Sequence, residues 1–316
     1  NAMTEALLKL LHDNPKWKLF SKNGFHGVRK HYSWDAHVDK YLTVLEPVLD
    51  NSEPLVRMCL KRRPMLYHDR AVISDLDQNL LGDPKALSQL IDTINANRKC
   101  STFGIATGRR LDSALTLLRE YNIPRPNVLI SSLGTEIYYA PNLTRDKAWT
   151  EHIDFHWNAR AVRRILTNIP GLSPQPKSEQ SAFKVSYFIN PRIAPDVQAI
   201  NHLLLQNDQS VNVVLSFGQF LDILPLRASK GLALRWFAEQ WEVPLDHILT
   251  AGGSGADEDM MRGNTLAVVV ANRHHEELSD LTDIESIYLS KQPFAAGIIE
   301  AIDHYDFYAS CEIPNT

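Results

Sequence analysis

The sequence predicts an α/β protein with a doubly wound parallel-sheet core, an inserted α+β cap domain and a helical N-terminal extension. Short apolar strands and amphipathic helices alternate from Arg70 onward, the alternation breaks near Arg145, and it resumes near Lys230. Such alternation is typical of a parallel sheet covered by helices. The segment that interrupts it has a mixed pattern, and we interpret it as a domain inserted into the core.

The chain is long enough for more than one domain. At about 150 residues per domain, a length of 316 residues predicts about two. The hydrophobic fraction of 44% and the charged fraction of 22% exclude disordered and fibrous classes, because both are ordinary for globular proteins. We expect an extension and linker over residues 1–68, a core over 69–144 and 226–302, a cap over 145–225, and a C-terminal tail over 303–316.

Charge, hydropathy and cysteine content also bear on which partners the protein binds and where in the cell it is found. A net charge of −4 argues against a nucleic-acid binder, which usually carries a basic surplus. The best apolar run, Leu266–Ala271, is too short to cross a membrane. The three cysteines lie far apart, which favours neither a zinc site nor a disulfide framework. These features, and an N-terminus without a signal peptide, predict a cytoplasmic protein.

The N-terminal extension is predicted to be helical from Thr4 to Leu49. Asn14-Pro15 is expected to end a first helix, and Asn23-Gly24 is a turn signal. Ser33 is a suitable N-cap for a further helix over Ala36–Leu49. Residues 50–63, with prolines nearby and a basic end, are predicted to form a linker or a short helix.

The core elements follow from apolar runs for strands and from apolar residues spaced three or four apart for helices. The first half is predicted to contain the strand Ala71–Ser74, the helix Pro84–Asn97, the strand Ser101–Ala106, the helix Leu111–Glu120, the strand Asn127–Ser131 and a hairpin over Glu136–Ala140. The second half is predicted to contain the helix Lys230–Gln240, the strand Ile248–Ala251, the helix Asp257–Arg262 and the strand Leu266–Val270.

The predicted cap has a different order of elements. It opens with a helix, continues through a loop rich in Pro, Ser and Gln, and ends in paired strands, which is an α+β pattern. The elements are the helix His152–Ile169, the loop Gly171–Gln180, the strand Phe183–Ile189, the helix Pro195–Gln206 and the strands Val211–Ser216 and Phe220–Leu224.

Two aspartates follow the first core strand directly, in Ser74-Asp75-Leu76-Asp77. In an open parallel sheet, ligands bind beyond the carboxyl ends of the strands. Two carboxylates in one pocket repel each other unless a cation lies between them, and Mg²⁺ prefers such oxygen ligands. One carboxylate is then suited to attack phosphorus while the other acts as general acid and base. The alternative is that these residues only form a turn or a helix cap.

Three further motifs support a phosphate site. Thr107 follows the second strand, where its hydroxyl and nearby backbone N–H groups can hold a phosphoryl oxygen, although a helix cap is an alternative. Lys230 opens a helix, where a cation opposes the helix dipole and needs another reason to be present. The loop Gly252–Asp257 joins a strand to a helix, and its glycines allow the backbone to approach a ligand.

In this order the four motifs resemble those of the haloacid-dehalogenase-like phosphatases whose α+β cap lies between the second and third motifs. Within that group the chain is most similar to the sucrose-phosphate phosphatases. The similarity extends from about Arg70 to Ile302, and it is carried by Ser74–Leu81, Ser132–Ile137, Phe183–Phe188, Phe220–Pro225 and the segment around Lys230.

The resemblance implies a Mg²⁺-dependent phosphatase of a sugar phosphate, sucrose 6-phosphate by analogy, that works through an aspartyl-phosphate. It implies that Asp75 is the nucleophile, that Asp77 is the acid and base, and that Asp257 joins both of them at the metal. It further implies that Thr107 and Lys230 hold the phosphoryl group. The residues implied in substrate binding are Asn79, Gly108, Arg109, Glu136 and Lys184.

Two motifs depart from the pattern of this family. In the first motif Asn79 stands where Thr is usual. In the fourth, Ala256 stands where an amide is usual and Gly253 where a carboxylate for the metal is usual, and the loss of that carboxylate should weaken Mg²⁺ binding. A positive φ angle at Gly253 would be a second reason for this glycine. Whether the site is catalytic is therefore left open. The alternative is a degenerate, non-catalytic domain that binds the product or regulates an attached synthase, and a third reading is a phosphotransferase.

The N-terminal extension carries a second resemblance. Trp17–Gly24 and His31–Val38 are similar to the C-terminal tail of retaining glycosyltransferases. With the phosphatase-like part behind it, the chain resembles the rear of a bacterial sucrose-phosphate synthase. This resemblance implies a glycosyltransferase domain, in the same chain or another, as a partner, and leaves open whether the sequence is a fragment.

Overall fold

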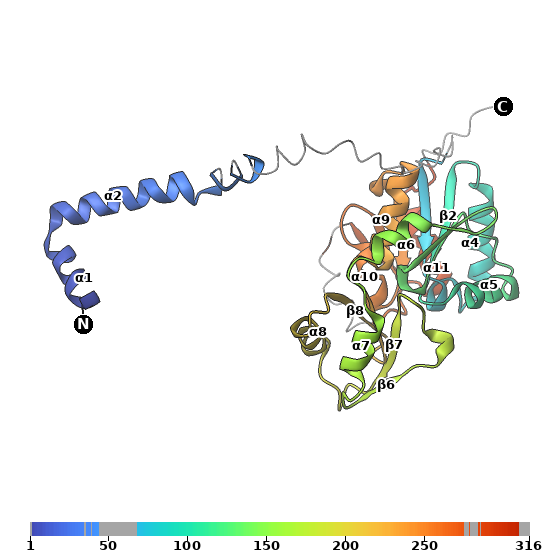
Figure 1. Cartoon of the computed structure of the whole chain (residues 1–316). Helices are drawn as coiled ribbons and strands as arrows, with labels where there is room; N and C mark the ends of the chain where they lie inside the picture. The colour runs from blue at the N-terminus through green and yellow to red at the C-terminus, as the bar shows by residue number, and fades with distance from the viewer. Residues whose placement is uncertain are drawn as a thin grey trace. The chain divides into compact units, whose positions relative to one another are not determined.

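A computed structural model describes residues 2–34, 36–38, 40–43, 68–274, 278, 284 and 286–309 of the chain. The chain divides into two units, Asn1–Leu60 and Lys61–Thr316, and each is described by itself (Figure 1). The described residues contain no helix that is both long and apolar enough to cross a membrane.

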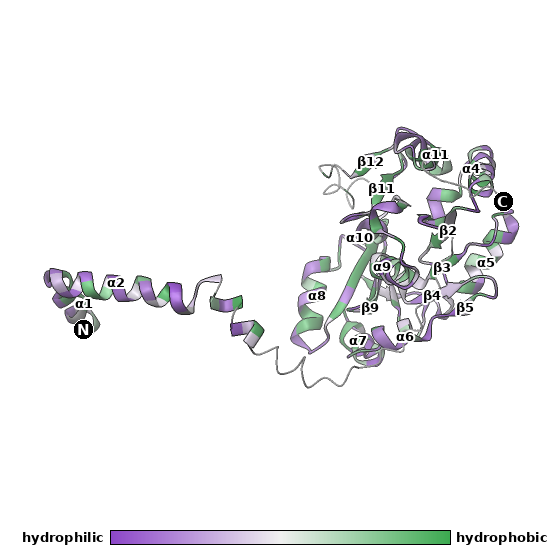
Figure 2. Cartoon of the chain, turned by 90° about the horizontal axis from the view of Figure 1, so that it is seen from above, coloured by the Kyte–Doolittle hydropathy of each residue, from purple (hydrophilic) through white to green (hydrophobic). Residues whose placement is uncertain are grey.

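The first unit begins with helices α1 (Ala2–His12) and α2 (Asn14–His31). The Asp13 side chain caps α2 by accepting a hydrogen bond of 3.1 Å from the Lys16 N–H. Hydrophilic and hydrophobic residues alternate along α2 (Figure 2), and large apolar side chains such as Phe25 are exposed. This unit therefore leaves apolar surface without cover among the residues described.

Two predictions for this unit have different outcomes. The turn at Asn23-Gly24 is wrong, because α2 runs through both residues; one glycine costs a helix only about 1 kcal/mol, which the capped helix tolerates. The cap at Ser33 is confirmed, since its hydroxyl accepts a hydrogen bond of 3.2 Å from the Ala36 N–H. The predicted helix beyond residue 43 and the predicted linker lie outside the described residues.

The second unit contains the core sheet, which has eight strands in the order β12-β11-β10-β1-β2-β3-β4-β5. The six strands from β12 to β3 are parallel, and β4 and β5 are antiparallel additions at one edge. The strands are β1 (Arg70–Ser74), β2 (Ser101–Ala106), β3 (Val128–Ser131), β4 (Glu136–Tyr139), β5 (Thr144–Arg145), β10 (Ile248–Gly252), β11 (Leu266–Val269) and β12 (Ile287–Leu289).

Helices cover both faces of this sheet, as the predicted fold class requires. One hydrophobic cluster packs side chains of α4 (Pro84–Ala96), α5 (Leu111–Glu120) and α11 (Phe294–His304) against one face. A second cluster packs α6, α9 and α10 against the other face. These helices span Lys147–Ile153, Lys230–Trp241 and Glu258–Met261.

The cap is a separate antiparallel sheet with the strand order β6-β7-β9-β8. Its own hydrophobic cluster joins the two helices α7 and α8 to the inner faces of β7 and β9. Together with the core sheet, this arrangement confirms the predicted fold class. The cap elements are β6 (Leu172–Pro174), β7 (Val185–Ile189), β8 (Val211–Ser216), β9 (Phe220–Pro225), α7 (Ala159–Leu166) and α8 (Val197–Gln206).

Several predicted elements need correction. The helix His152–Ile169 is two helices, α6 and α7, because the chain reverses at His156 with a positive φ of 57° and Asn158 caps a new start. The loop Gly171–Gln180 contains the edge strand β6. The helix Asp257–Arg262 is a 3₁₀ turn, Gly255–Asp257, followed by the short α10. β12 and α11 were not predicted at all.

The cysteine spacing gave no indication of a disulfide bond, but Cys100 takes part in one.

Candidate functional site

The candidate site lies where the central strands of the core sheet end. β1 lies between β10 and β2, all three are parallel, and their carboxyl ends therefore share one edge. Asp75 follows β1, Thr107 follows β2, and Gly253 follows β10. The sheet thus brings together three of the four sequence motifs, and the start of α9 adds Lys230 as the fourth.

Lys230 joins two buried carboxylates at the centre of the site. Its Nζ lies 2.8 Å from Asp75 Oδ1 and 2.7 Å from Asp257 Oδ1, and all three residues are buried. Ser229 caps α9 by accepting a hydrogen bond of 3.0 Å from the Leu232 N–H, so Lys230 is the first residue of the helix. The two carboxylates are the reason that a cation is kept at this end of the dipole.

Burial and charge set the protonation of this trio. Burial raises the pKa of Asp75 to about 7, although the Lys230 ammonium opposes that rise. Burial alone would lower the pKa of Lys230, but Asp257 and Asp75 together outweigh it and raise the pKa. Lys230 therefore stays charged at neutral pH, while Asp75 exchanges its proton near neutrality.

Asp257 is engaged through both of its oxygens. Its Oδ2 accepts hydrogen bonds from the Gly253 N–H (3.0 Å), the Ser254 N–H (3.0 Å) and the Ser254 hydroxyl (2.9 Å). Its Oδ1 accepts from Lys230. With Ser254 this makes a capping box at the start of the 3₁₀ turn. Asp257 therefore holds the glycine-rich loop and Lys230 in place.

Asp77 points to a different partner from Asp75. Arg109 donates two hydrogen bonds to it, from Nε to Oδ2 and from Nη2 to Oδ1, each 2.7 Å long. The backbone turns over Leu76–Leu80, where Gln78, directly after Asp77, has a positive φ of 56°. Arg109 was predicted to bind substrate, and the structure places it on Asp77; its role toward substrate stays a prediction.

Asn79 lies next to Asp75 and Asp77 and is 1% exposed. Its amide Nδ2 is 3.5 Å from Asp75 Oδ2 and 3.5 Å from the main-chain oxygen of Asp77. Its Oδ1 is buried and has no hydrogen-bond partner among the residues that the structure describes. A Cβ atom built on Gly253 would lie 3.6 Å from the same amide nitrogen. Asn79 and Gly253, one departure from each motif, are therefore neighbours in space.

The loop after β2 is fixed from two sides. The Thr107 hydroxyl accepts a hydrogen bond of 3.2 Å from the Arg109 N–H, as a cap would. The Gly108 carbonyl accepts a hydrogen bond of 3.2 Å from Lys184 Nζ, which comes from the cap. Thr107 and Gly108 thus lie at the site edge, and their predicted contacts with a phosphate ester or sugar stay predictions.

Lys184 belongs to a buried network that sequence reasoning did not identify. Its Nζ is 3.8 Å from Asp222 Oδ1, and the Ser186 hydroxyl donates a hydrogen bond to the same carboxylate. Burial raises the pKa of Asp222, and Lys184 opposes that rise. The only available signal was the polar pair Ser186 and Asp222 within two apolar strands, where they are direct partners in the sheet. Both are buried, on the face opposite the hydrophobic cluster of the cap.

Glu136, also predicted to contact substrate, lies in a polar cluster on β4. It pairs with Arg145 at 3.4 Å. It also accepts hydrogen bonds of 3.2 Å from the Ser131 hydroxyl and 3.2 Å from the Tyr138 hydroxyl. The structure thus gives both Glu136 and Lys184 structural partners, and their sugar contacts stay predictions.

The side chains that would hold a metal ion are already engaged with other partners. In the part of the chain that the structure describes, no group of three or more His, Cys, Asp or Glu side chains is arranged to hold one. Asp77 is held by Arg109, and Asp257 is occupied by four protein donors. Gly253 offers no side chain. In this arrangement the residues present do not fit the implied Mg²⁺ site. That Asp75, Asp77 and Asp257 are metal ligands is a prediction from the family resemblance.

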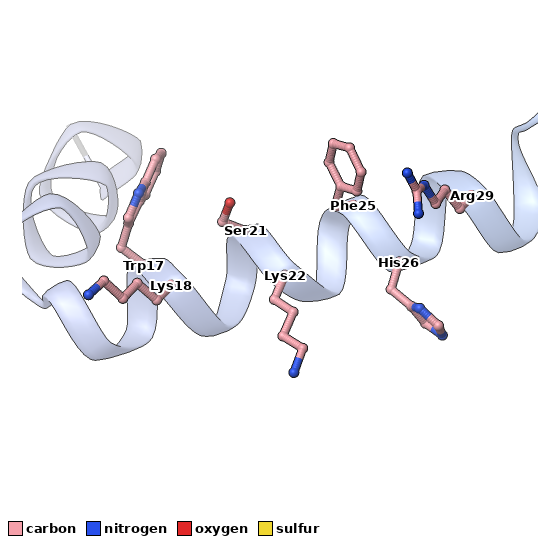
Figure 3. Close-up of a pocket in the computed structure, with 7 residues that line it drawn as sticks. All are labelled: Trp17, Lys18, Ser21, Lys22, Phe25, His26 and Arg29. Carbon is pink, nitrogen blue, oxygen red and sulfur yellow. The ribbon is translucent and has the colours of Figure 1, made fainter.

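A cleft of about 670 Å³ lies between the cap and the core beside Lys230. That volume is in the range of small-molecule sites. Its polar lining includes Ser229 and Lys230 from the core and Gln198 and Asn212 from the cap. A separate hollow lies along α2 of the first unit (Figure 3), and it carries basic and aromatic side chains without any carboxylate.

Comparisons with known proteins agree with the geometry. Residues 68–306 match the family described as sucrose-6F-phosphate phosphohydrolase. A mannosylfructose-phosphate phosphatase from Agrobacterium fabrum is 29% identical over 75% of this chain and 96% of its own. A probable sucrose-phosphatase from Arabidopsis thaliana is 30% identical, over 74% of this chain and 59% of its own length.

Two further proteins bear on the fold and on domain combinations. The structure of the sucrose-phosphatase from Synechocystis in complex with sucrose and phosphate has a TM-score of 0.72, at 29% identity over 76% of this chain and 98% of its own. A glucosylglycerol-phosphate synthase from Pseudomonas anguilliseptica is 28% identical over 74% of this chain, which corresponds to 30% of the synthase. The matched part of this chain is therefore similar both to separate phosphatases and to one part of a larger synthase.

Proposed function

The chain belongs to the sucrose-6F-phosphate phosphohydrolase family, and from this premise we propose that its core site hydrolyses the phosphate ester of a sugar phosphate. The observation that carries the proposal is the Lys230 bridge between Asp75 and Asp257, at the edge where β1 and β10 end. A buried ammonium that also lines the cleft is suited to a phosphoryl group and to a developing negative charge.

The reaction that fits these residues has two steps. Asp75 Oδ2 attacks phosphorus, since Oδ1 is held by Lys230. The bond from phosphorus to the sugar oxygen breaks, and Asp77 gives its proton to that oxygen. In the second step Asp77 takes a proton from water, whose oxygen attacks the aspartyl-phosphate and releases inorganic phosphate and free Asp75. Thr107 and Lys230 hold the phosphoryl oxygens in both steps.

We propose sucrose 6-phosphate as the substrate to test first. The relatives named above include enzymes of sucrose phosphate and of mannosylfructose phosphate, both of which are disaccharide phosphates. The cleft beside Lys230 is large enough for such a ligand. Asn79, Gly108, Arg109, Glu136 and Lys184 are the proposed substrate contacts, and residues 145–225 are the proposed cap.

Mg²⁺ is the cofactor that the family resemblance implies, and when bound it would neutralise charge on the carboxylates and the phosphate. Because the donors present do not fit it, no step above depends on the metal.

The cytoplasm is the proposed location.

A second candidate function is a non-catalytic domain that binds a sugar phosphate and regulates an attached glycosyltransferase. It is favoured by Gly253, which removes a carboxylate, and by the exposed apolar side chains of α1 and α2, such as Trp17 and Phe25. The similarity to one part of a larger synthase supports the same idea. A glycosyltransferase domain, in this chain or another, is then the proposed partner.

One experiment separates the two functions. Sucrose 6-phosphate is titrated calorimetrically, and phosphate release is then assayed on the same sample. Release that is lost in Asp75→Asn supports the phosphatase. Binding without release supports the regulatory domain, and neither binding nor release by folded protein would remove both.

A further inference from the structure

We infer that the side-chain amide of Asn79 takes the place of a divalent cation, so that the site receives a phosphate ester without Mg²⁺. The identity of the ligand as a phosphate ester rests on the proposed function, whereas the exclusion of the cation rests on geometry alone.

The first step is the position of the amide nitrogen. Asn79 Nδ2 lies 3.5 Å from Asp75 Oδ2 and 3.5 Å from the main-chain oxygen of Asp77. A carboxylate oxygen and a carbonyl oxygen that face one point are the ligands that Mg²⁺ prefers. Here they face the two N–H donors of an amide. The amide nitrogen therefore lies on the side of these two oxygens where a cation would bind.

The second step is the space that Gly253 leaves. A Cβ on Gly253 would point toward the Asn79 amide, at 3.6 Å from Nδ2, and would lie 3.1 Å from Val270 Cγ2. A carboxylate extended from that Cβ would compete for the place of the amide. Gly253 does not have a left-handed backbone, so positive φ is not the reason for this glycine.

The third step is charge. The carboxylates of Asp75, Asp77 and Asp257 are each in contact with a protein cation, either Lys230 or Arg109. Part of the neutralisation that a divalent cation supplies is thus built into the chain. Asp257 has no oxygen left without a donor, and it cannot turn to a metal without releasing the glycine-rich loop.

The fourth step is the orientation of the amide. Asn79 Oδ1 is buried without a partner among the described residues. Turning the amide over would place Oδ1 against the oxygens of Asp75 and Asp77, which is repulsive unless a cation lies between them. The nitrogen-inward orientation is therefore the one expected without metal, and the opposite orientation would report a bound ion.

The test uses Mn²⁺ as the probe, measured by electron paramagnetic resonance on the full chain. Four proteins are compared: the parent, Asn79→Thr, Gly253→Asp and the double variant, with Asn79→Ser in reserve if Asn79→Thr does not fold. Thermal melting checks folding. The parent should leave free Mn²⁺ unchanged, and the double variant should bind about one equivalent. A parent that binds Mn²⁺, and loses it in Asp75→Asn, would overturn the inference, as would a folded double variant that binds none.

A second measurement separates this inference from the proposed function. Inorganic phosphate is titrated calorimetrically into the parent with EDTA and with excess Mg²⁺. The dissociation constant should agree within about twofold, and a tenfold tightening by Mg²⁺ would overturn the inference. If phosphate binds in neither condition, the proposed function fails, while the Mn²⁺ titration still decides the role of Asn79.

Discussion

Arg109 holds both carboxylate oxygens of Asp77, with two hydrogen bonds of 2.7 Å each. The hydrogen bonds to Asp77 raise the pKa of the Arg109 guanidinium, so it remains charged. One guanidinium therefore holds both oxygens of the proposed acid and base. The pairing fixes where its oxygens point, and Arg109 becomes a candidate for a positioning residue of the proposed reaction.

Arg109→Lys separates this role from the proposed substrate contact: with Arg109 acting through Asp77, kcat should fall about tenfold and KM should stay nearly unchanged. A lysine supplies one point charge and cannot hold both oxygens of Asp77 in a fixed plane. The thermal midpoint should change by about 2 °C or less, because the pair is partly exposed and such pairs contribute little stability. Steady-state phosphate release gives both constants. Arg110→Lys, next in the chain, is the matched control, and a raised KM with unchanged kcat would instead assign Arg109 to substrate binding.

Asp75→Asn is expected to reduce phosphate release by on the order of 10³ or more, because an amide oxygen cannot act as the nucleophile. The variant should still bind inorganic phosphate, and more tightly than the parent, because one negative charge next to the ligand is removed. Calorimetry and a phosphate assay measure the two effects. Asp92→Asn, on the exposed side of α4, is the control. Release at the parent rate would exclude Asp75 as the nucleophile.

The pKa of Asp75, raised to about 7 chiefly by burial, predicts a pH dependence of stability. Between the ordinary Asp pKa near 4 and about 7, the folded state binds more protons than the unfolded state. The free energy of unfolding should therefore fall as the pH rises through this window, by at most about 1.4 kcal/mol per pH unit. Below the window the effect is absent, and above it the loss is complete.

Urea denaturation of the parent and of Asp75→Asn at pH 5, 6, 7 and 8 isolates this effect, because the difference between the two proteins cancels other groups. The stability of the parent relative to the variant should decrease with rising pH. Parallel curves would show that Asp75 keeps an ordinary pKa.

Much of the core was predictable because its signals are local. The strands β1 and β2 are short apolar runs, and each leads directly into a polar loop that carries Asp75 or Thr107. Lys230 was predictable as well, because the helix dipole disfavours a cation at a helix start and a nearby anion is needed to compensate. The parallel sheet then brings these loops to one edge without any further information in the sequence.

The contacts that decide the chemistry were less accessible, because they depend on pairing between distant segments. Nothing in the sequence indicated that Arg109 would face Asp77. Nor did it indicate that the Asp257 carboxylate would accept hydrogen bonds from its own glycine-rich loop. The neighbourhood of Asn79 and Gly253 required the turn after β1 and the loop after β10 to meet. The break at His156 rests on a positive φ at a residue type that gives no turn signal by itself.

Lys184→Met is expected to lower the free energy of unfolding by about 3–5 kcal/mol, since it leaves the buried Asp222 without a cation. Part of the loss should be recovered by Asp222→Asn in the same chain, because the unpaired charge is then removed. Urea denaturation of both variants measures this. Lys177→Met, at an exposed position of the cap, is the control, and an equal effect from it would assign the loss to something other than the buried pair.

Deletion of residues 1–43, which leaves all three cysteines in the chain, is expected to leave the thermal midpoint of the remaining chain within about 2 °C. The three hydrophobic clusters lie entirely between Ala71 and Phe307, and none of the described residues of the deleted segment belongs to them. The same deletion should reduce self-association, because exposed apolar side chains such as Trp17 and Phe25 on α2 favour contact with other surfaces. Light scattering over a range of protein concentrations measures the mass. The double variant Trp17→Ser and Phe25→Ser, with its helix otherwise intact, should reproduce the lower mass without a change in midpoint. A truncated chain that melts many degrees earlier would show that the second unit depends on the first for its stability.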